Sequence, residues 1–170
     1  MRLQPASSDP YSVAIRATVN SIDTGRTVPA RTMLSDYLRT ELGLRGTKVS
    51  CEMQVCGACS VLVDGSPVSA CTALAADIDG CEVRTVEGLA PGDGTLGHLQ
   101  AAFVDHFALQ CGFCTPGFLM MATALLEENP APTAEQVAEY LDGNICRCTG
   151  YEPIITAVLD AAGRIRAEAR

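Results

Sequence analysis

The sequence SCEMQVCGACSVLVDGSPVSAC, residues 50–71, decides how the first part of this chain folds. It contains a C-x4-C-x2-C loop followed, after eleven residues (60–70), by a fourth cysteine, a spacing typical of the thiolate ligands of a 2Fe-2S cluster. Four thiolates must surround two irons, so a short loop wraps one side of the cluster and a more distant residue closes the other. Gly57 and Ala58 leave room for backbone N–H groups to reach the sulfurs. The predicted ligands are Cys51, Cys56, Cys59 and Cys71.

A second group of cysteines occurs in QCGFC, residues 110–114, and ICRC, residues 145–148. Thirty-one residues (115–145) separate its C-x2-C pair from its C-x-C pair. By spacing alone, four thiolates in two close pairs fit either a structural zinc site or a second 2Fe-2S cluster. The neighbouring first set favours the cluster, so we expect two 2Fe-2S clusters. The predicted ligands of the second are Cys111, Cys114, Cys146 and Cys148.

Nine cysteines in 170 residues also raise the alternative of a disulfide scaffold. We expect reduced thiols instead, because the cysteines cluster at motif spacing and a chain with 48% hydrophobic residues can bury a core without cross-links. Residues 1–15 show neither the apolar segment nor the cleavage signal of an exported precursor. Cys81 lies outside both sets, and we expect it to be a buried small apolar residue.

The composition narrows the possible partners. A formal charge of −8 with only twelve Lys and Arg residues, scattered along the chain, argues against binding to nucleic acid. No apolar run approaches the length of a membrane span. We therefore expect protein partners and, since the thiols must stay reduced, a cytoplasmic location.

The first half of the chain, residues 11–86, carries the pattern of strands around one helix. YSVAIRATVN, residues 11–20, alternates apolar and polar residues, and Asp23-Thr24-Gly25 predicts a turn before the next strand. Thr32 is the predicted N-cap of a helix over residues 33–42, which Gly43 ends. Residues 60–71 predict a hairpin that turns at Asp64-Gly65, and residues 82–86 a last strand. A ferredoxin-like β-grasp domain follows from this pattern.

The second half predicts helices. Residues 87–94, rich in Gly, Pro and acidic residues, form the predicted linker, and residues 95–170 the second domain. The expected caps are Thr95, Thr115 followed by Pro116, and Thr133 paired with Gln136, and the fourth helix follows Pro153. The predicted fold class is α+β, with an N-terminal plant-type ferredoxin-like β-grasp and a C-terminal four-helix bundle, each holding one 2Fe-2S cluster.

Taken together, SCEMQVCGACSVLVDG, Cys71, LQCGFCTPGFLM and DGNICRCTGYEPI closely resemble the small iron-sulfur subunit of molybdenum hydroxylases of the xanthine oxidase family. The resemblance covers residues 11 to about 162. It is nearest to the separate small subunits of three-subunit bacterial enzymes such as aerobic carbon monoxide dehydrogenase, quinoline oxidoreductase and nicotine dehydrogenase. Thr115-Pro116-Gly117 is similar to the branch whose partners include a flavin subunit.

The resemblance implies a role for each cysteine set. The set around Cys51 would hold the cluster distal from molybdenum, and the set around Cys111 the proximal cluster. Gln110, by spacing an ordinary polar loop residue, would hydrogen-bond the pterin of the molybdenum cofactor, and the loop of Cys148 would approach the same pterin. The implied partners are a large molybdenum subunit and a medium FAD subunit, in a dimer of heterotrimers.

The expected function is electron transfer within an oxidoreductase. This chain would relay electrons one at a time from the molybdenum cofactor to FAD, during oxidation of a small, N-heteroaromatic substrate. No nucleotide-binding fingerprint or catalytic constellation stands out, so no catalytic residue is predicted here. Two alternatives remain: a free two-cluster ferredoxin-type carrier, which would purify as a monomer, and a zinc-bound interaction module, which would lack a visible spectrum.

Overall fold

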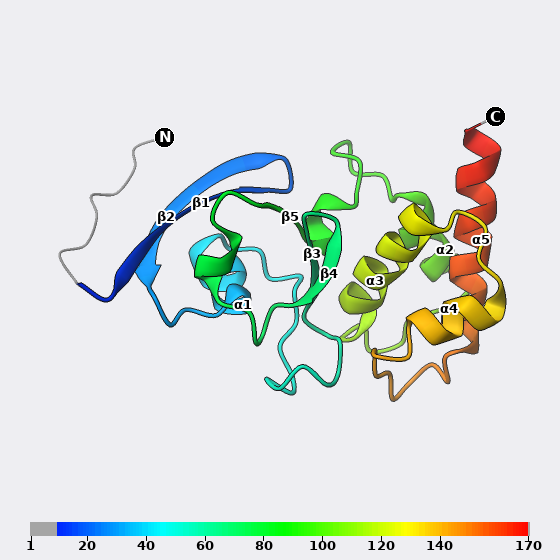
Figure 1. The fold of residues 1–170 in the computed structure, drawn as a ribbon. Helices are drawn as coiled ribbons and strands as arrows, with labels where there is room; N and C mark the ends of the chain where they lie inside the picture. The colour runs from blue at the N-terminus through cyan, green and yellow to red at the C-terminus, as the bar shows by residue number, and fades with distance from the viewer. Residues whose placement is uncertain (1–9, 170) are drawn as a thin grey trace.

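A sheet and a group of helices lie next to each other along the molecule. The computed structural model describes residues 10–169, with the sheet in the N-terminal half and the longer helices in the C-terminal half (Figure 1). The start of the first strand and the end of the last helix lie at opposite ends (Figure 1). Residues 1–9, part of the stretch in which no export signal is predicted, lie outside the described residues.

The sheet is mixed, with strand order β2-β1-β5-β3-β4. β1 and β5 pair in parallel in the interior of the sheet, and the other neighbours are antiparallel. The connection from β2 to β3, residues 30–59, contains both the helix of this half and the first cysteine loop. The strands are β1 (Ser12–Val19), β2 (Ile22–Pro29), β3 (Ser60–Val63), β4 (Ser66–Ser69) and β5 (Glu82–Arg84).

The first hairpin turns at Asn20-Ser21, so the predicted turn at Asp23-Thr24-Gly25 is wrong. Asn20 and Ser21 both have positive φ, 49° and 63°. Two-residue hairpin turns whose twist matches that of the strands require positive φ at both positions. Asp23, Thr24 and Gly25 instead pair with β1. The second hairpin turns at Asp64-Gly65 as predicted.

The helix of the sheet half is shorter and wider than predicted. α1 (Leu34–Asp36) continues as a π-helical turn over Tyr37–Glu41. The predicted cap, Thr32, is wrong, because Met33 is the N-cap and the Leu34 amide donates to the Ala73 carbonyl. A neighbouring backbone segment thus takes the place of the expected hydroxyl. Gly43, at φ 74°, follows the end of the helix in the expected left-handed conformation.

The four helices of the second half follow the predicted order. Thr133 and Gln136 form the predicted capping box. Thr95 caps no helix, because its hydroxyl donates to Asp93 at 2.7 Å and α2 starts after Gly97. The predicted cap Thr115 is also wrong, because Cys114 is the N-cap of α3 and Thr115 is its first residue. The helices are α2 (His98–Asp105), α3 (Thr115–Glu128), α4 (Ala134–Tyr140) and α5 (Glu152–Glu168).

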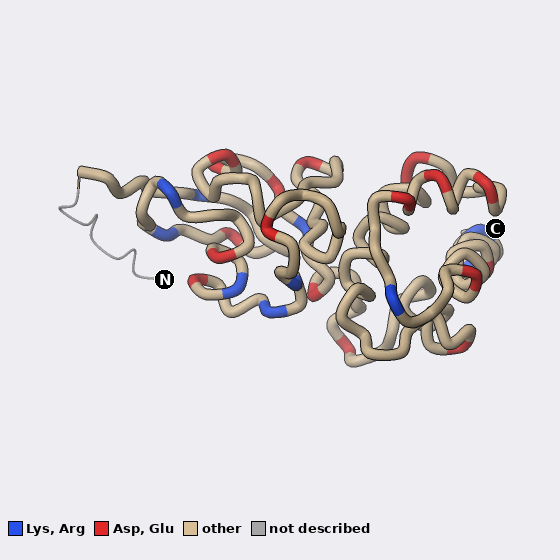
Figure 2. Tube along the Cα trace, turned by 90° about the horizontal axis from the view of Figure 1, so that it is seen from below, with Lys and Arg blue, Asp and Glu red and all other residues tan. Residues whose placement is uncertain are grey.

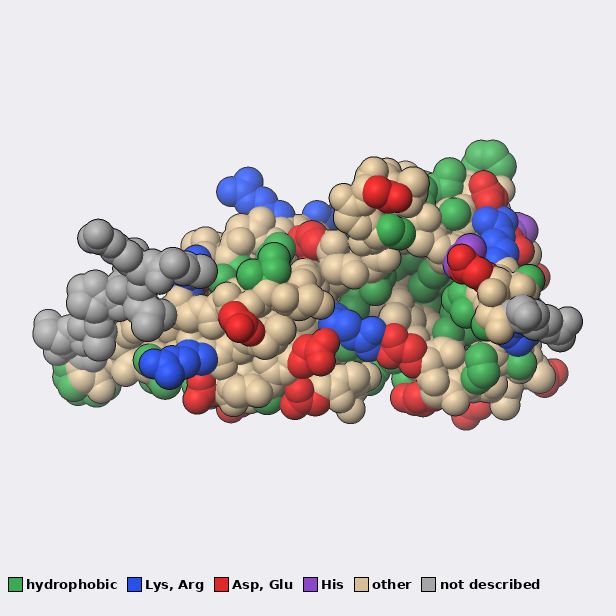
Figure 3. All heavy atoms as spheres, turned by 90° about the horizontal axis from the view of Figure 1, so that it is seen from above, with side chains coloured by type: hydrophobic (Ala, Val, Ile, Leu, Met, Phe, Trp, Pro, Cys, Tyr) green, Lys and Arg blue, Asp and Glu red, His purple; other side chains and the backbone are tan. Residues whose placement is uncertain are grey.

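Each half buries its own core, and β3 joins them. Alternate β3 side chains point to opposite faces of the sheet. Val61 packs with α1 and the sheet core, whereas Leu62 packs with Met120 and Ala124 of α3. Figure 3 shows further hydrophobic side chains on the surface between the two halves. We call the contact of Leu62, Met120 and Ala124 the seam.

Over residues 10–169, Figure 2 shows Asp and Glu scattered over both halves, and most Lys and Arg on the sheet half. Within residues 10–169, no helix combines the length and the apolar character that a membrane crossing requires.

Candidate metal centres

The first cysteine loop is tightly coiled around the thiol of Cys51. Glu52, Gln54 and Gly57 all have positive φ, between 55° and 67°, so the backbone turns its amides inward. The Val55 amide donates to Cys51 Sγ at 3.3 Å. Hydrogen bonds from the amides of Met53, Val55 and Cys56 lower the pKa of the Cys51 thiol to about 6. These donors favour the thiolate form of Cys51, which is the form that binds iron.

The other two thiols of this set are anchored in the sheet. Cys59 directly precedes β3 and Cys71 comes shortly after β4, and they are only 2% and 7% exposed. Burial raises the pKa of Cys59 to about 11, and the neighbouring thiols of Cys71 and Cys56 contribute to the shift. The four thiols thus converge as two interacting pairs, Cys51 with Cys56 and Cys59 with Cys71.

The second set also converges, although its two segments are far apart in sequence. Cys111 Sγ and Cys148 Sγ lie 3.7 Å apart, and both residues are exposed. Cys114 and Cys146 form the inner pair: burial raises the pKa of Cys114 to about 12, with the Cys146 thiol adding to the effect. The structure therefore brings together all four cysteines that the sequence grouped.

Cys146 receives three hydrogen bonds from the turn that follows it. Thr149 Oγ1 lies 3.2 Å from Cys146 Sγ, and the amides of Thr149 and Cys148 lie at 3.4 and 3.5 Å. Burial opposes ionisation of Cys146, but these donors outweigh it and lower its pKa. Such donors also stabilise the sulfur of a metal-bound thiolate.

The donor chemistry fits a two-iron group. A structural zinc ion needs four ligands around a single centre, whereas a 2Fe-2S cluster takes two thiolates on each iron. Both sets contain close thiol pairs, such as Cys111 and Cys148 at 3.7 Å, and such pairs match the two thiolates that each iron takes. Thr115 Oγ1, next to Cys114, is buried without a hydrogen-bond partner. A sulfur-containing group in the second set would offer that hydroxyl an acceptor.

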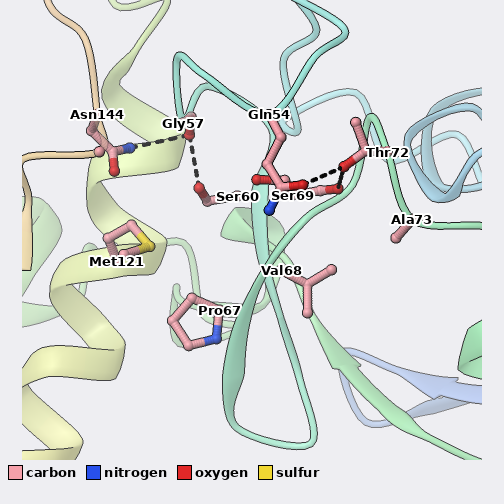
Figure 4. Close-up of a pocket in the computed structure, with 11 residues that line it drawn as sticks. Gln54, Gly57, Ser60, Pro67, Val68, Ser69, Thr72, Ala73, Met121 and Asn144 are labelled. Carbon is pink, nitrogen blue, oxygen red and sulfur yellow. Dashed lines mark hydrogen bonds between the residues drawn. The ribbon is translucent and has the colours of Figure 1, made fainter.

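The two cysteine sets are joined by direct hydrogen bonds. The Ile145 amide donates to the Cys56 carbonyl at 3.0 Å, and Asn144 Nδ2 donates to the Gly57 carbonyl at 3.1 Å (Figure 4). This contact borders an open cavity of about 460 Å³ lined from both halves. Atoms of the first cysteine loop and of the last one are therefore in contact, with no intervening segment.

Gln110 lies on the surface beside the outer pair of the second set. Its Nε2 donates to the Cys148 carbonyl at 2.9 Å, and Gln110, Cys111 and Cys148 are all exposed. The residue to which the family resemblance assigns the pterin contact thus lies beside the Cys148 loop, on an outward-facing surface.

Sequence reasoning missed Asn144, Thr149 and Tyr151. The Tyr151 hydroxyl accepts from the Cys146 amide at 3.0 Å, and the Tyr151 ring meets Phe118 edge-on. All three residues flank ICRC in the sequence, and this proximity could have identified them. The spacing of the cysteines alone does not show which flanking side chains contact a thiol. Cys81 is only partly buried, so the expectation of full burial is wrong.

The two histidines lie away from both sets. His98 contacts Glu168, and His106 contacts Asp160 at 2.8 Å, so both pair with carboxylates of α5. Figure 3 shows histidine side chains beside acidic and basic ones at the helical end. They connect α2 to α5.

Comparison with known proteins adds independent support. Residues 33–93 match the model of the 2Fe-2S iron-sulfur cluster binding domain, and residues 85–159 that of the 2Fe-2S binding domain. The chain is 55% identical to the nicotine 6-hydroxylase small subunit of Paenarthrobacter nicotinovorans, over 95% of each protein.

Solved structures agree. A chain of quinoline 2-oxidoreductase from Pseudomonas putida 86 matches with a TM-score of 0.89 and 47% identity, over 92% of this chain and 98% of that one. Aldehyde oxidoreductase from Desulfovibrio gigas matches with a TM-score of 0.87 and 44% identity, but this chain covers only 17% of it. The same unit thus occurs both as a separate chain and within a much longer one. The chain belongs to the family of small 2Fe-2S subunits of the xanthine oxidase family molybdenum hydroxylases.

Proposed function

We propose that this chain is the electron-transfer subunit of a molybdenum hydroxylase. The observation that carries the proposal is the pairing of eight thiols into two sets that contact each other through the Cys56 carbonyl and the Ile145 amide. Residues 11–86 would form a plant-type ferredoxin-like β-grasp domain, residues 87–94 a linker and residues 95–170 a four-helix bundle domain. Each domain would hold one 2Fe-2S cluster.

The two clusters would take fixed places in the relay. Cys51, Cys56, Cys59 and Cys71 would hold the cluster distal from molybdenum, and Cys111, Cys114, Cys146 and Cys148 the proximal one. When bound, the clusters supply one-electron redox chemistry, so electrons would pass one at a time from the molybdenum cofactor to FAD on partner subunits. The exposed position of Cys111 and Cys148 supports placing the second set against the molybdenum subunit.

The residues of this chain bind the clusters and adjust their surroundings. Amides of the first loop and Thr149 of the last loop donate to the thiolates, which favours the more negative, reduced state of each centre. Cys114 is the N-cap of α3, so the positive end of that helix dipole lies beside the second set. Gln110 and the Cys148 loop would contact the pterin of the molybdenum cofactor. None of these residues takes part in substrate chemistry.

The names of relatives, such as the nicotine 6-hydroxylase small subunit, support a multi-subunit enzyme. We propose a large molybdenum-binding subunit and a medium FAD-binding subunit, in a dimer of heterotrimers in the cytoplasm. Relatives named nicotine 6-hydroxylase and quinoline 2-oxidoreductase support a small N-heteroaromatic substrate.

Electron paramagnetic resonance on the enzyme purified with its native partners tests the proposal. After reduction with dithionite, we expect two distinct 2Fe-2S signals, one broadened by molybdenum, with matching iron content. Zinc in place of iron would mean an interaction module, and two signals in a monomer without molybdenum would mean a free carrier. Either result would overturn the proposal.

A further inference from the structure

The carbonyl of Gly57 is a point where backbone and side-chain groups of both halves meet. Gly57 lies between Cys56 and Cys59, with φ +67°. Its oxygen accepts hydrogen bonds from Ser60 N at 3.2 Å and Ser60 Oγ at 2.8 Å, both within the sheet half. A further donor, Asn144 Nδ2 at 3.1 Å, reaches it from the helical half (Figure 4).

Asn144 is held tightly in this contact. It is only 2% exposed and lies two residues before Cys146. A Cβ atom added to Gly57 would lie 2.6 Å from Asn144 Cγ and Nδ2, so the amide packs directly against the backbone of the first cysteine loop. A buried amide that loses its hydrogen-bond partner is destabilising, so this hydrogen bond resists opening.

The first turn of α3 closes the same carbonyl from another side. A Cβ atom added to Gly117 would lie 2.2 Å from the Gly57 oxygen and 3.1 Å from Asn144 Nδ2. Gly117 is three residues after Cys114. The Gly57 carbonyl is thus enclosed by its own loop, by Asn144 and by the backbone of α3. Asn144 and Gly117 each lie within three residues of a predicted ligand of the second set, Cys146 and Cys114 respectively.

We infer that Asn144 is a positioning residue that fixes the separation of the two clusters. The inference rests on the proposed function, because it requires a cluster in each cysteine set. Asn144 touches neither set of sulfurs and acts through the Gly57 carbonyl. Since the electron-transfer rate falls exponentially with distance, a small opening of this contact slows exchange between the clusters.

Two substitutions open the contact in different ways. Asn144→Leu keeps a similar volume and removes the donor. Gly117→Ala places a methyl group against the Gly57 oxygen, which forces the halves apart. Ser60→Ala is the matched control, because it removes a donor to the same carbonyl from within the sheet half and leaves the cross-half bond in place.

The experiment measures the magnetic interaction between the clusters in the dithionite-reduced enzyme, purified with its partners. Pulsed and continuous-wave electron paramagnetic resonance give the splitting and the relaxation enhancement, and iron analysis gives the cluster content. In Asn144→Leu and Gly117→Ala we expect both signals, with a smaller splitting and slower relaxation. In Ser60→Ala we expect the wild-type splitting.

The outcomes separate the inference from the proposed function. An unchanged splitting in Asn144→Leu and Gly117→Ala, with both clusters present, overturns the inference and leaves the electron-transfer function intact. Absence of two 2Fe-2S signals from the wild-type enzyme overturns the proposed function, and the inference with it. If Asn144→Leu loses iron, the same splitting is measured on Asn144→Asp instead. This variant keeps the shape of the side chain but replaces the hydrogen-bond donor with an acceptor.

Discussion

The two cysteine sets have the same layout but different supports. In the first set Cys59 and Cys71 are 2% and 7% exposed and the other two thiols are partly buried, whereas in the second set Cys111 and Cys148 lie on the surface. The first set comes from a loop and the ends of a hairpin in one continuous stretch. The second is assembled from two helix-flanking segments separated by thirty-one residues (115–145).

This difference shows which interactions hold each set. Backbone amides of a coiled loop surround Cys51, so the local sequence is sufficient to orient it. Cys146 contacts the Thr149 hydroxyl and the Tyr151 hydroxyl, and the Tyr151 ring packs against Phe118 of α3. The first set is therefore organised by its own loop, and the second by the tertiary structure of the helical half.

The largest expected effect comes from removing an inward thiol. Cys59→Ser and Cys146→Ser should each abolish one of the two electron paramagnetic resonance signals and remove about half of the iron, since a 2Fe-2S cluster requires all four thiolates. Iron analysis with spectroscopy on the purified enzyme measures both. Loss of both signals in either variant would show that the two sets do not assemble independently.

The seam should be the next most sensitive region. Met120→Ala removes a side chain that is 1% exposed and packs against Leu62, and we expect it to lower the free energy of unfolding by about 3 kcal/mol. Denaturant unfolding, followed by circular dichroism, gives the value. Met121→Ala is the control, because Met121 is only partly buried and should cost less. Equal losses would contradict the role of the seam.

Thr149 should distinguish the two sets electronically. Thr149→Val removes the hydroxyl 3.2 Å from Cys146 Sγ, and the reduced cluster then loses a stabilising donor. We expect the potential of the second cluster to fall by about 40 mV, equivalent to about 1 kcal/mol for one electron. Redox titration measures both potentials. Thr149→Ser keeps the hydroxyl and should match wild type, and an equal shift of the first cluster would refute the assignment.

The smallest effect is expected for the ion pair that joins the halves at the surface. Arg84 binds Glu127 through two hydrogen bonds of 2.6 Å, and this lowers the pKa of Glu127 below its usual value of 4.5 although burial opposes the shift. The stability gained is therefore complete above pH 4.5 and is lost as the pH falls through the lower folded-state pKa. Because the pair is partly exposed, we expect about 0.5 kcal/mol.

A double-mutant cycle checks this value. Unfolding of wild type, Arg84→Gln, Glu127→Gln and the double variant, measured at several pH values on both sides of 4.5, gives the coupling energy. A coupling that persists unchanged at the acidic end would mean that Glu127 is not the titrating partner.

Much of the fold was predictable because its signals are local. Asp64-Gly65 and the Thr133–Gln136 capping box depend on residues close in sequence, and the structure confirms both. The predictions at Asp23-Thr24-Gly25, Thr32 and Thr95 were wrong because another local or tertiary hydrogen bond replaced the expected one: Asn20-Ser21 takes the turn, Ala73 binds the Leu34 amide and Asp93 binds the Thr95 hydroxyl. The domain boundaries, the ligand roles and the pterin contact of Gln110 stay predictions.

The sequence by itself determined which eight cysteines form two groups, because ligand spacing is written directly into the chain. Only the tertiary structure decided how the groups relate: which thiols form pairs, which pair faces outward, and how Asn144 and Gly117 enclose the Gly57 carbonyl. Those relations join residues up to 87 positions apart, between Gly57 and Asn144. They depend on the packing of α3 against β3, which no local pattern specifies.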